Sequence, residues 1–394
     1  MSWVEGQTLT ARWESAKQVG QQLHGHWKLG TSCSHFVQVL AEHTPKLVRA
    51  IAKRLRGQMI KMAGLHARRC RWIALAADGS RIEAPHTEAN EDGLGCAGRQ
   101  KTAPQVYLTT LWHMGLGLPW DFRVGPGTSS ERAHLTNMLD DLPPGAMIVA
   151  DAGFTSYDLC QRMINSGLSF LLRVGNNVHL LTKLGWEVEQ RDDLVYLWPR
   201  KRRDQAPLVL RLIRVTSGKQ TIYLLTNVLD HKALTDEEAA TLYEMRWGVE
   251  LSFRSYKQTL DRHKLLSRTP ATCLAEASWT MLGLWLLGLL AVSQLLTTGT
   301  DPLELSVAAA RNAVRRAMRT IDQRPRRQRW RLSEALASSV KDRYHRHTSK
   351  TARNYPRKKK QTPPGPPKIK TATLQELQQA QKLKATIKQK PRAA

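Results

Sequence analysis

The chain has 394 residues, of which 41% are hydrophobic, enough for a large core and two or three domains. Its formal charge of +27 indicates a polyanionic partner, since neutralising phosphates releases condensed counterions; an anionic membrane surface is the competing partner. The five cysteines include no CxxC pair, which argues against a disulfide framework and a zinc site. The N-terminus lacks a basic flank followed by an apolar run, so we expect no signal peptide and a cytoplasmic protein.

Residues 1–68 are predicted to form a helical N-terminal region. Leu47, Val48, Ile51 and Leu55 repeat at helical spacing, with lysines and arginines between them. A basic helix of this kind could bind a DNA end. It could equally dock on the main domain with its basic face in water, and the sequence does not decide between the two.

Apolar runs and helical patterns alternate through residues 69–174. RWIALAADGSRIEAPH predicts two strands that meet at a turn at Asp78-Gly79-Ser80. Further strands are predicted in APQVYLTTLWHM, in AMIVADAGF, which ends at Asp151, and in LSFLLRV; helices are predicted in SSERAHLTNMLDDL and TSYDLCQRMINSG. This order of elements predicts a mixed α/β sheet with helices on its faces.

Residues 175–232 are mainly strand-like and are predicted to be a β-rich insertion. Its most basic stretch, from Arg200 to Arg203, lies beside Trp198 in an expected hairpin loop. Basic and aromatic residues together suit a loop that holds a nucleic-acid strand by stacking. A hairpin tip in water is nearly as consistent with the same residues.

A helix is predicted from Thr235 to Leu260, because Thr235 and Glu238 have the spacing of a capping box. Tyr243, Arg246, Glu250 and Lys257 fall within roughly 60° of one another at about 100° per residue, so one face would hold all four. Gly248 weakens the case for an unbroken helix. Such mixed charges can also form an ordinary solvated surface.

Residues 233–343 are predicted to hold the second part of the core and the C-terminal helices. Residues 344–394 are predicted to form a basic disordered tail. No charged residue occurs from Ala277 to Thr300, which is long enough for a membrane span. Its polar residues and the lack of a second span favour a helix buried against a sheet. The lysine-rich tail contains one acid, Glu376, and is expected to bind DNA or RNA non-specifically.

Three carboxylates on separate elements, Asp78, Asp151 and Glu250, could meet at the carboxyl edge of the sheet. Close like charges require a cation, and ligation by oxygen alone suits Mg²⁺ or Mn²⁺. Two such ions, about 3.5–4 Å apart, can activate a water or a 3′-hydroxyl in phosphodiester transfer. Arginine, lysine and tyrosine beside the glutamate would suit contacts with phosphate.

The segments ALAADGS, IVADAGFTSYDL and YEMRWGVELSFRSYK resemble the three signatures of the DDE transposases of insertion-sequence family four, with the Y-R-E-K motif. The third signature matches at all four spacings, and the resemblance spans roughly residues 71–290. It implies an RNase H-like catalytic domain with a β-rich insertion before the catalytic glutamate. It also implies cut-and-paste transposition with Mg²⁺, or Mn²⁺ in its place.

By motif position, the resemblance implies catalytic, metal-binding acids at Asp78, Asp151 and Glu250, and DNA-binding residues at Tyr243, Arg246 and Lys257. The expected partners are double-stranded DNA (terminal inverted repeats and target) and a second copy in a paired-end homodimer. We expect a prokaryotic protein associated with the nucleoid, without membrane association. In some relatives a tryptophan of the insertion stacks near a flipped base, for which Trp186 and Trp198 are candidates. Asp121 and Glu131 are interpreted as structural acids.

Three other functions remain open. An RNase H-like two-metal nuclease without strand transfer would use the same acids. A catalytically silent DNA-binding relative is disfavoured, since all three acids are present. The third alternative, a membrane-associated basic protein, is supported only by the apolar stretch from Ala277 to Leu296.

Overall fold

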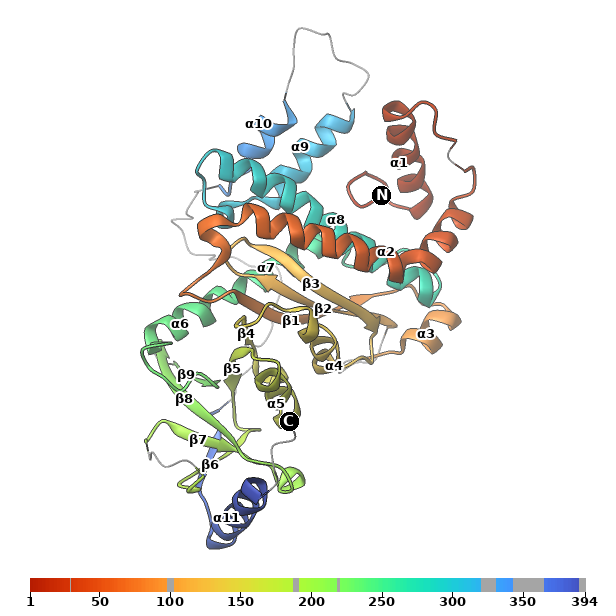
Figure 1. Cartoon of the computed structure of the whole chain (residues 1–394). Helices are drawn as coiled ribbons and strands as arrows, with labels where there is room; N and C mark the ends of the chain where they lie inside the picture. Colours follow the sequence, from red (N-terminus) through yellow and green to blue (C-terminus); the bar gives the residue numbers. More distant parts are fainter. Residues whose placement is uncertain are drawn as a thin grey trace, which may run out of the picture. The chain divides into compact units, whose positions relative to one another are not determined.

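The computed structural model describes residues 1–28, 30–97, 103–186, 191–217, 220–319, 331–342 and 365–389. The chain divides into two compact units, each containing helices and strands (Figure 1). Unit 1 comprises Met1–Ala146 and Glu244–Lys341, and unit 2 comprises Met147–Tyr243 and Asp342–Ala394. The mixed α/β class predicted from the sequence is confirmed. The division into five predicted segments stays a prediction; the clustering into two units places residues 147–174 with the β-rich region.

Unit 1 is rich in helices, and its N-terminal region is helical as predicted. Thr8 and Ser32 cap the first two helices through side-chain oxygens that accept backbone N–H groups. The helices are α1 (Leu9–Leu23), α2 (Cys33–Met62), α3 (Glu88–Leu94), α4 (Glu131–Thr136), α7 (Trp247–Arg254), α8 (Pro270–Thr297), α9 (Val307–Arg319) and α10 (Leu332–Ala337).

Helix α8 is the apolar stretch that is long enough to cross a membrane. It lies against α2 and β3 inside unit 1 (Figure 1), and Trp285, Leu287 and Val292 on it are fully buried. Since most of its apolar side chains are buried within the unit, with Leu286 and Leu290 exposed, the predicted core helix is confirmed.

Three antiparallel strands form the sheet of unit 1, in the order β1 (Ala74–Glu83), β2 (Gln105–His113) and β3 (Leu118–Pro126). The predicted turn at Asp78-Gly79-Ser80 is wrong, because β1 runs through it without interruption and Asp78 pairs with Thr110. Gly79 is needed for a close approach. A Cβ there would lie 2.5 Å from the Tyr107 hydroxyl, so only glycine lets that ring cross the strand.

Unit 2 has a mixed sheet in the order β10-β6-β7-β8-β9-β5-β4. Strands β4 and β5 are parallel, β10 is parallel to β6, and the other pairs are antiparallel. The elements are β4 (Met147–Ala150), α5 (Tyr157–Asn165), β5 (Ser169–Val174), β6 (His179–Thr182), β7 (Leu194–Leu197), β8 (Leu208–Ser217), β9 (Gln220–Thr226), β10 (Lys368–Thr371), α11 (Leu374–Gln389) and α6 (Asp236–Met245), which begins in this unit. Residues 187–190 and 218–219 of the predicted β-rich insertion lie outside the described residues.

The predicted disorder of the tail is wrong for residues 365–389. Strand β10 pairs with β6, and α11 begins with a capping box in which Glu376 accepts from the Thr373 backbone N–H at 2.9 Å. Two alanines, Ala372 and Ala380, are buried against the unit. The run of Leu, Gln, Lys and Ala has high helix propensity, which the low apolar content obscured. Residues 343–364 lie outside the described residues.

Trp198 does not sit in a loop where a base could stack on it. Its side chain is buried, its Nε1 donates to the Gln205 carbonyl at 2.7 Å, and the Arg203 guanidinium covers its ring at 4.1 Å. Arg203 is in turn paired with Glu376 at 2.6 Å. The basic stretch is therefore partly neutralised by the tail.

Removing the Glu376 carboxylate should destabilise unit 2. Glu376→Ala loses both the capping bond and the largely buried ion pair with Arg203, and should lower the free energy of unfolding by about 2 kcal/mol. Glu376→Gln keeps an acceptor for the cap and should cost about 1 kcal/mol. Urea denaturation of both variants measures this. A cost near zero for Glu376→Gln would show that the charge on Arg203 is not being neutralised here, and equal costs for the two variants would show that the capping bond contributes nothing.

Candidate active site

The helix that begins the third signature starts as the sequence predicts. The Thr235 N–H donates to Glu238 Oε2 at 3.0 Å, and the Glu238 N–H donates to Thr235 Oγ1 at 3.1 Å. These reciprocal bonds satisfy two N–H groups that the first turn leaves unpaired. The capping box is therefore confirmed.

The predicted single helix is instead built in three pieces. Helix α6 ends at Met245, α7 runs from Trp247, and Ser255–Thr259 form a π-helical turn. In that turn the Leu260 N–H donates to the Ser255 carbonyl at 3.0 Å, and the Arg262 N–H to the Lys257 carbonyl at 2.9 Å. Turns of this type occur frequently at functional sites.

Unit 1 brings Asp78, Arg246 and Glu250 together. Arg246 Nη2 lies 3.0 Å from Glu250 Oε1, and its Nη1 lies 3.9 Å from Asp78 Oδ2. The guanidinium is almost fully buried, with 10% of its side chain exposed, whereas a third of the Glu250 side chain faces solvent. One buried cation thus lies between a carboxylate of β1 and a carboxylate of α7.

The environment of Asp78 disfavours its charged form. Burial raises the pKa of its carboxyl from 3.8 to about 6, while the Gly79 N–H, which donates to Oδ1 at 2.8 Å, and Arg246 act in the opposite direction. Glu250 and Glu131 add repulsion. A carboxylate with this uncompensated charge is suited to bind a further cation.

Lys257 lies beside the same strand. Its Nζ donates to Ser80 Oγ at 2.8 Å, and burial lowers the pKa of its ammonium group. Ser80 and Asp78 are two residues apart on β1, so their side chains share one face of the strand. The sequence interpretation missed Ser80 because the expected turn obscured this alternation.

Unit 2 positions Asp151 directly after β4, as the sequence predicts. Its Oδ1 accepts from the Ala152 N–H at 2.8 Å and from the Tyr243 hydroxyl at 3.5 Å. Arg173 Nη1 from β5 lies 4.0 Å from the same oxygen, a partner that the sequence interpretation missed. Nearly half of the Asp151 side chain remains exposed.

Neither unit by itself, over the residues described, gathers three His, Cys, Asp or Glu side chains that could hold a metal. The donors present are nevertheless suitable for a hard divalent cation. Asp78 and Glu250 offer carboxylate oxygens only, and the Arg246 guanidinium between them shows that the pair attracts positive charge. These residues therefore fit the metal that the resemblance implies.

The two other acids near the sheet are already paired. Asp121 is buried and lies 3.0 Å from Arg56 and 2.9 Å from Arg123. Glu131 accepts from the Tyr107 hydroxyl at 2.6 Å, over the backbone of Gly79. Both partners are consistent with the structural role predicted for these acids.

Comparison with known proteins decides the family. Residues 72–286, more than half of the chain, match the family described as Transposase DDE domain. The chain belongs to this family. The match includes all six residues predicted for the site, from Asp78 to Lys257.

Two curated relatives match the chain over shorter stretches. The transposase InsG for insertion sequence element IS4 of Escherichia coli (strain K12) is 27% identical over 224 residues, covering 54% of this chain and 50% of that protein. The transposase for insertion sequence element IS231F of Bacillus thuringiensis subsp. israelensis is 28% identical over 108 residues, covering 27% of this chain and 22% of that protein. The chain thus spans half or less of the relatives it matches.

A solved structure of a piggyBac transposase synaptic complex with hairpin DNA is a distant likeness. It covers 72% of this chain and 60% of that chain, with 11% identity and a TM-score of 0.36. A likeness this distant does not bear on the fold or the site of this member of the DDE family.

Asp78 should make the metal-free protein less stable as the pH rises. The folded state keeps the Asp78 proton up to about pH 6 and the unfolded chain only to about pH 4, so this contribution to stability is present at low pH and is lost across that window. Asp78→Asn should therefore raise the free energy of unfolding at pH 8 by about 1–3 kcal/mol and change it little at pH 4.

The measurement is urea denaturation in a chelator at both pH values. Asp92→Asn is the matched control, because Asp92 is an exposed carboxylate on α3, and it should stay within about 0.5 kcal/mol of wild type. A loss of stability in Asp78→Asn at pH 8 would contradict the assigned burial cost.

Proposed function

We propose that this chain is a DNA transposase that cleaves the ends of an insertion sequence and joins them to target DNA. The observation that supports this most strongly is the buried Arg246 between Asp78 and Glu250, within a matched transposase DDE domain. An RNase H-like core is proposed for the region that includes β1, β2 and β3, from the resemblance of its three signatures. The relatives named above are transposases of insertion sequences, and cut-and-paste transposition is proposed here by that similarity.

Asp78, Asp151 and Glu250 are proposed as the ligands of divalent metal ions, with Mg²⁺ as the resident ion and Mn²⁺ able to replace it. When bound, the metal would supply an activated water or 3′-hydroxyl and would stabilise the leaving oxygen. The role of Asp78 is to deliver a carboxylate from the rigid middle of β1. The role of Glu250 is to deliver a second one from α7, on the side where solvent reaches it.

Arg246, Lys257 and Tyr243 are proposed to bind DNA. Arg246 can hold a phosphate with two parallel N–H donors, and Lys257 offers a single point charge beside Ser80. The Tyr243 hydroxyl, which donates to Asp151 in the DNA-free protein, can donate its single proton to a phosphate oxygen instead. The net charge of +27 would bring DNA to these residues.

A paired-end homodimer and association with the bacterial nucleoid, in the cytoplasm, are proposed on the same resemblance. Cutting both ends of one element requires two sites, and a C2 dimer supplies them. The partners would be double-stranded terminal inverted repeats and target DNA.

Neutralising any proposed metal ligand should abolish cleavage while leaving DNA binding largely intact. Asp78→Asn, Asp151→Asn and Glu250→Gln keep side-chain volume and remove one negative charge each. DNA binding should persist, because the many lysines and arginines of the protein are unchanged. The assay is Mg²⁺-dependent cleavage of DNA that contains the inverted repeats flanking the gene, with Asp92→Asn as control. Retained cleavage by one variant would remove that residue from the site.

Products of the same assay separate the alternative functions. Joining of the cleaved ends to a second DNA molecule identifies a transposase. Cleavage without joining identifies a two-metal nuclease, and binding with neither product identifies a silent relative.

Arg246→Lys should weaken engagement of the DNA end by about 1–3 kcal/mol, because lysine keeps the charge but loses the planar pair of donors. Lys257→Arg should cost less, since a point contact tolerates a larger cation. End-binding affinity and cleavage rate at fixed salt measure both. If the two variants both stayed within about 0.5 kcal/mol of wild type, the helix face would be an ordinary solvated surface.

A further inference from the structure

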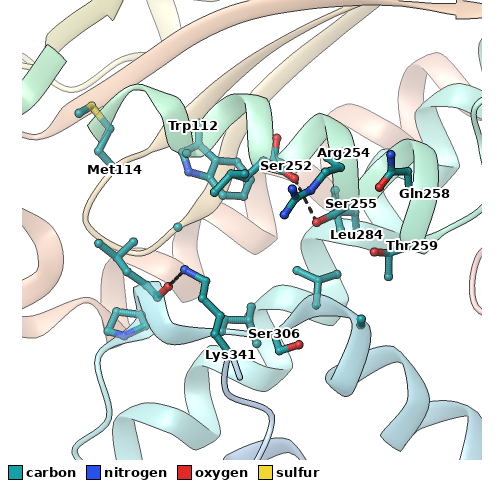
Figure 2. A pocket seen from close by; sticks show the side chains of 18 of the residues that line it. Trp112, Met114, Ser252, Arg254, Ser255, Gln258, Thr259, Leu284, Ser306 and Lys341 are labelled. Carbon is teal, nitrogen blue, oxygen red and sulfur yellow. Dashed lines mark hydrogen bonds between the residues drawn. The ribbon is translucent and has the colours of Figure 1, made fainter. Parts of the chain in front are cut away.

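Behind α7 lies a cavity of about 380 Å³, within unit 1 (Figure 2). Its walls come from α7, the π-helical turn, β2, α8 and the segment that begins α9. The volume lies within the range of sites that hold small organic molecules. Nothing in the proposed chemistry at Asp78 and Glu250 uses this space.

The lining combines a flat apolar surface with positive charge. Trp112, Leu284 and Leu305 provide apolar walls, and Arg254 and Lys341 provide two cations. Among the described residues that line the cavity there is no Asp or Glu. Arg254 forms no ion pair with any described residue, and Lys341 Nζ donates to the Leu303 carbonyl. Figure 2 shows Arg254 and Lys341 reaching toward the hollow from opposite sides.

The cavity and the candidate active site lie on different, adjoining faces of α7. Arg246 and Glu250 point toward β1, whereas Gly248, Leu251 and Ser252 line the cavity. At about 100° per residue, these three residues lie roughly 100–200° around the helix from Glu250, whereas Arg254, four residues after Glu250, lies about 40° from it and lines the cavity from the edge of that face. A Cβ on Gly248 would lie 3.2 Å from Trp112 Nε1, so α7 rests close against one wall of the cavity.

We propose that this cavity binds a small organic anion with a flat apolar body. The apolar part would lie between Trp112 and Leu284, and the acidic group would lie between Arg254 and Lys341. Such a molecule would bring a negative charge to Arg254 and Lys341, which the lining itself does not supply, and would cover the apolar walls at Trp112 and Leu284.

Occupancy should also change the rate of DNA cleavage, because the ligand would hold α7 from behind while Glu250 projects from its other face. This second part depends on the proposed transposase function. The binding part does not, so the two can fail separately.

The test uses a matched pair of fluorescent probes on the full chain. The probe 1-anilinonaphthalene-8-sulfonate has the flat body and an anionic group, and N-phenyl-1-naphthylamine is the same body without the charge. Wild type should bind the sulfonate about tenfold more tightly, as expected for one charge-assisted contact. Arg254→Gln should remove that preference, and Lys53→Gln, at an exposed lysine of α2, should keep it.

A second pair of variants tests the location. Ala308 is exposed and lines the cavity, so Ala308→Trp should block entry without disturbing the core. Ala50→Trp, at an exposed alanine of α2, is the control and should leave probe binding unchanged. Equal affinity for the two probes in wild type, a preference that survives Arg254→Gln, or full binding by Ala308→Trp would each overturn the proposed site.

Cleavage assays with saturating sulfonate probe complete the test. The rate should change in wild type and stay constant in Ala308→Trp; the same response in both would overturn the effect on α7. A protein that binds the probe in this manner but cleaves no DNA would refute the proposed function and its regulation, and the binding site would stand.

Discussion

Two carboxylates held near one another, Asp78 on β1 and Glu250 on α7, impose the constraint on which the candidate site depends. Burial raises the pKa of Asp78 to about 6, and repulsion from Glu250 adds to this cost, because neighbouring like charges repel or take up a proton. The guanidinium of Arg246 reduces the repulsion from its position between them. This arrangement requires α7 to lie close to the sheet, and Gly248 permits this beside Trp112.

Local backbone features decide where the other functional groups lie. Because β1 continues through Asp78-Gly79-Ser80, the acid and the hydroxyl share one face, and Gly79 lets Tyr107 cross the strand on the opposite face. The π-helical turn then sets the direction of Lys257, whose Nζ reaches Ser80. Neither feature follows from the regular 3.6-residue period, which assumes one unbroken helix.

The parts that could be predicted from the sequence are those with short-range causes. The capping box at Thr235, the buried strand before Asp151 and the core helix α8 each follow from local pattern. The parts that failed depend on distant partners. Gly79 predicts a turn at Asp78-Gly79-Ser80, because the sequence does not show that Tyr107 on β2 lies against the backbone of Gly79. Trp198 is predicted to be available for stacking and the tail to be disordered, because local pattern does not show the long-range contacts of Arg203 with Trp198 and Glu376, or the pairing of β10 with β6.

Arg246 links the two proposed roles of the site. In the metal-free protein its buried charge is needed by Asp78 and Glu250, so it cannot bind a phosphate fully without leaving those carboxylates less compensated. A divalent cation bound by the same carboxylates would compensate them with twice the charge, and the guanidinium would then be available to a phosphate of the DNA. Metal binding and engagement of the DNA end should therefore favour each other through this one side chain. The metal compensates the two carboxylates when Arg246 turns to the phosphate, and the phosphate takes up the charge of Arg246 when the metal replaces it.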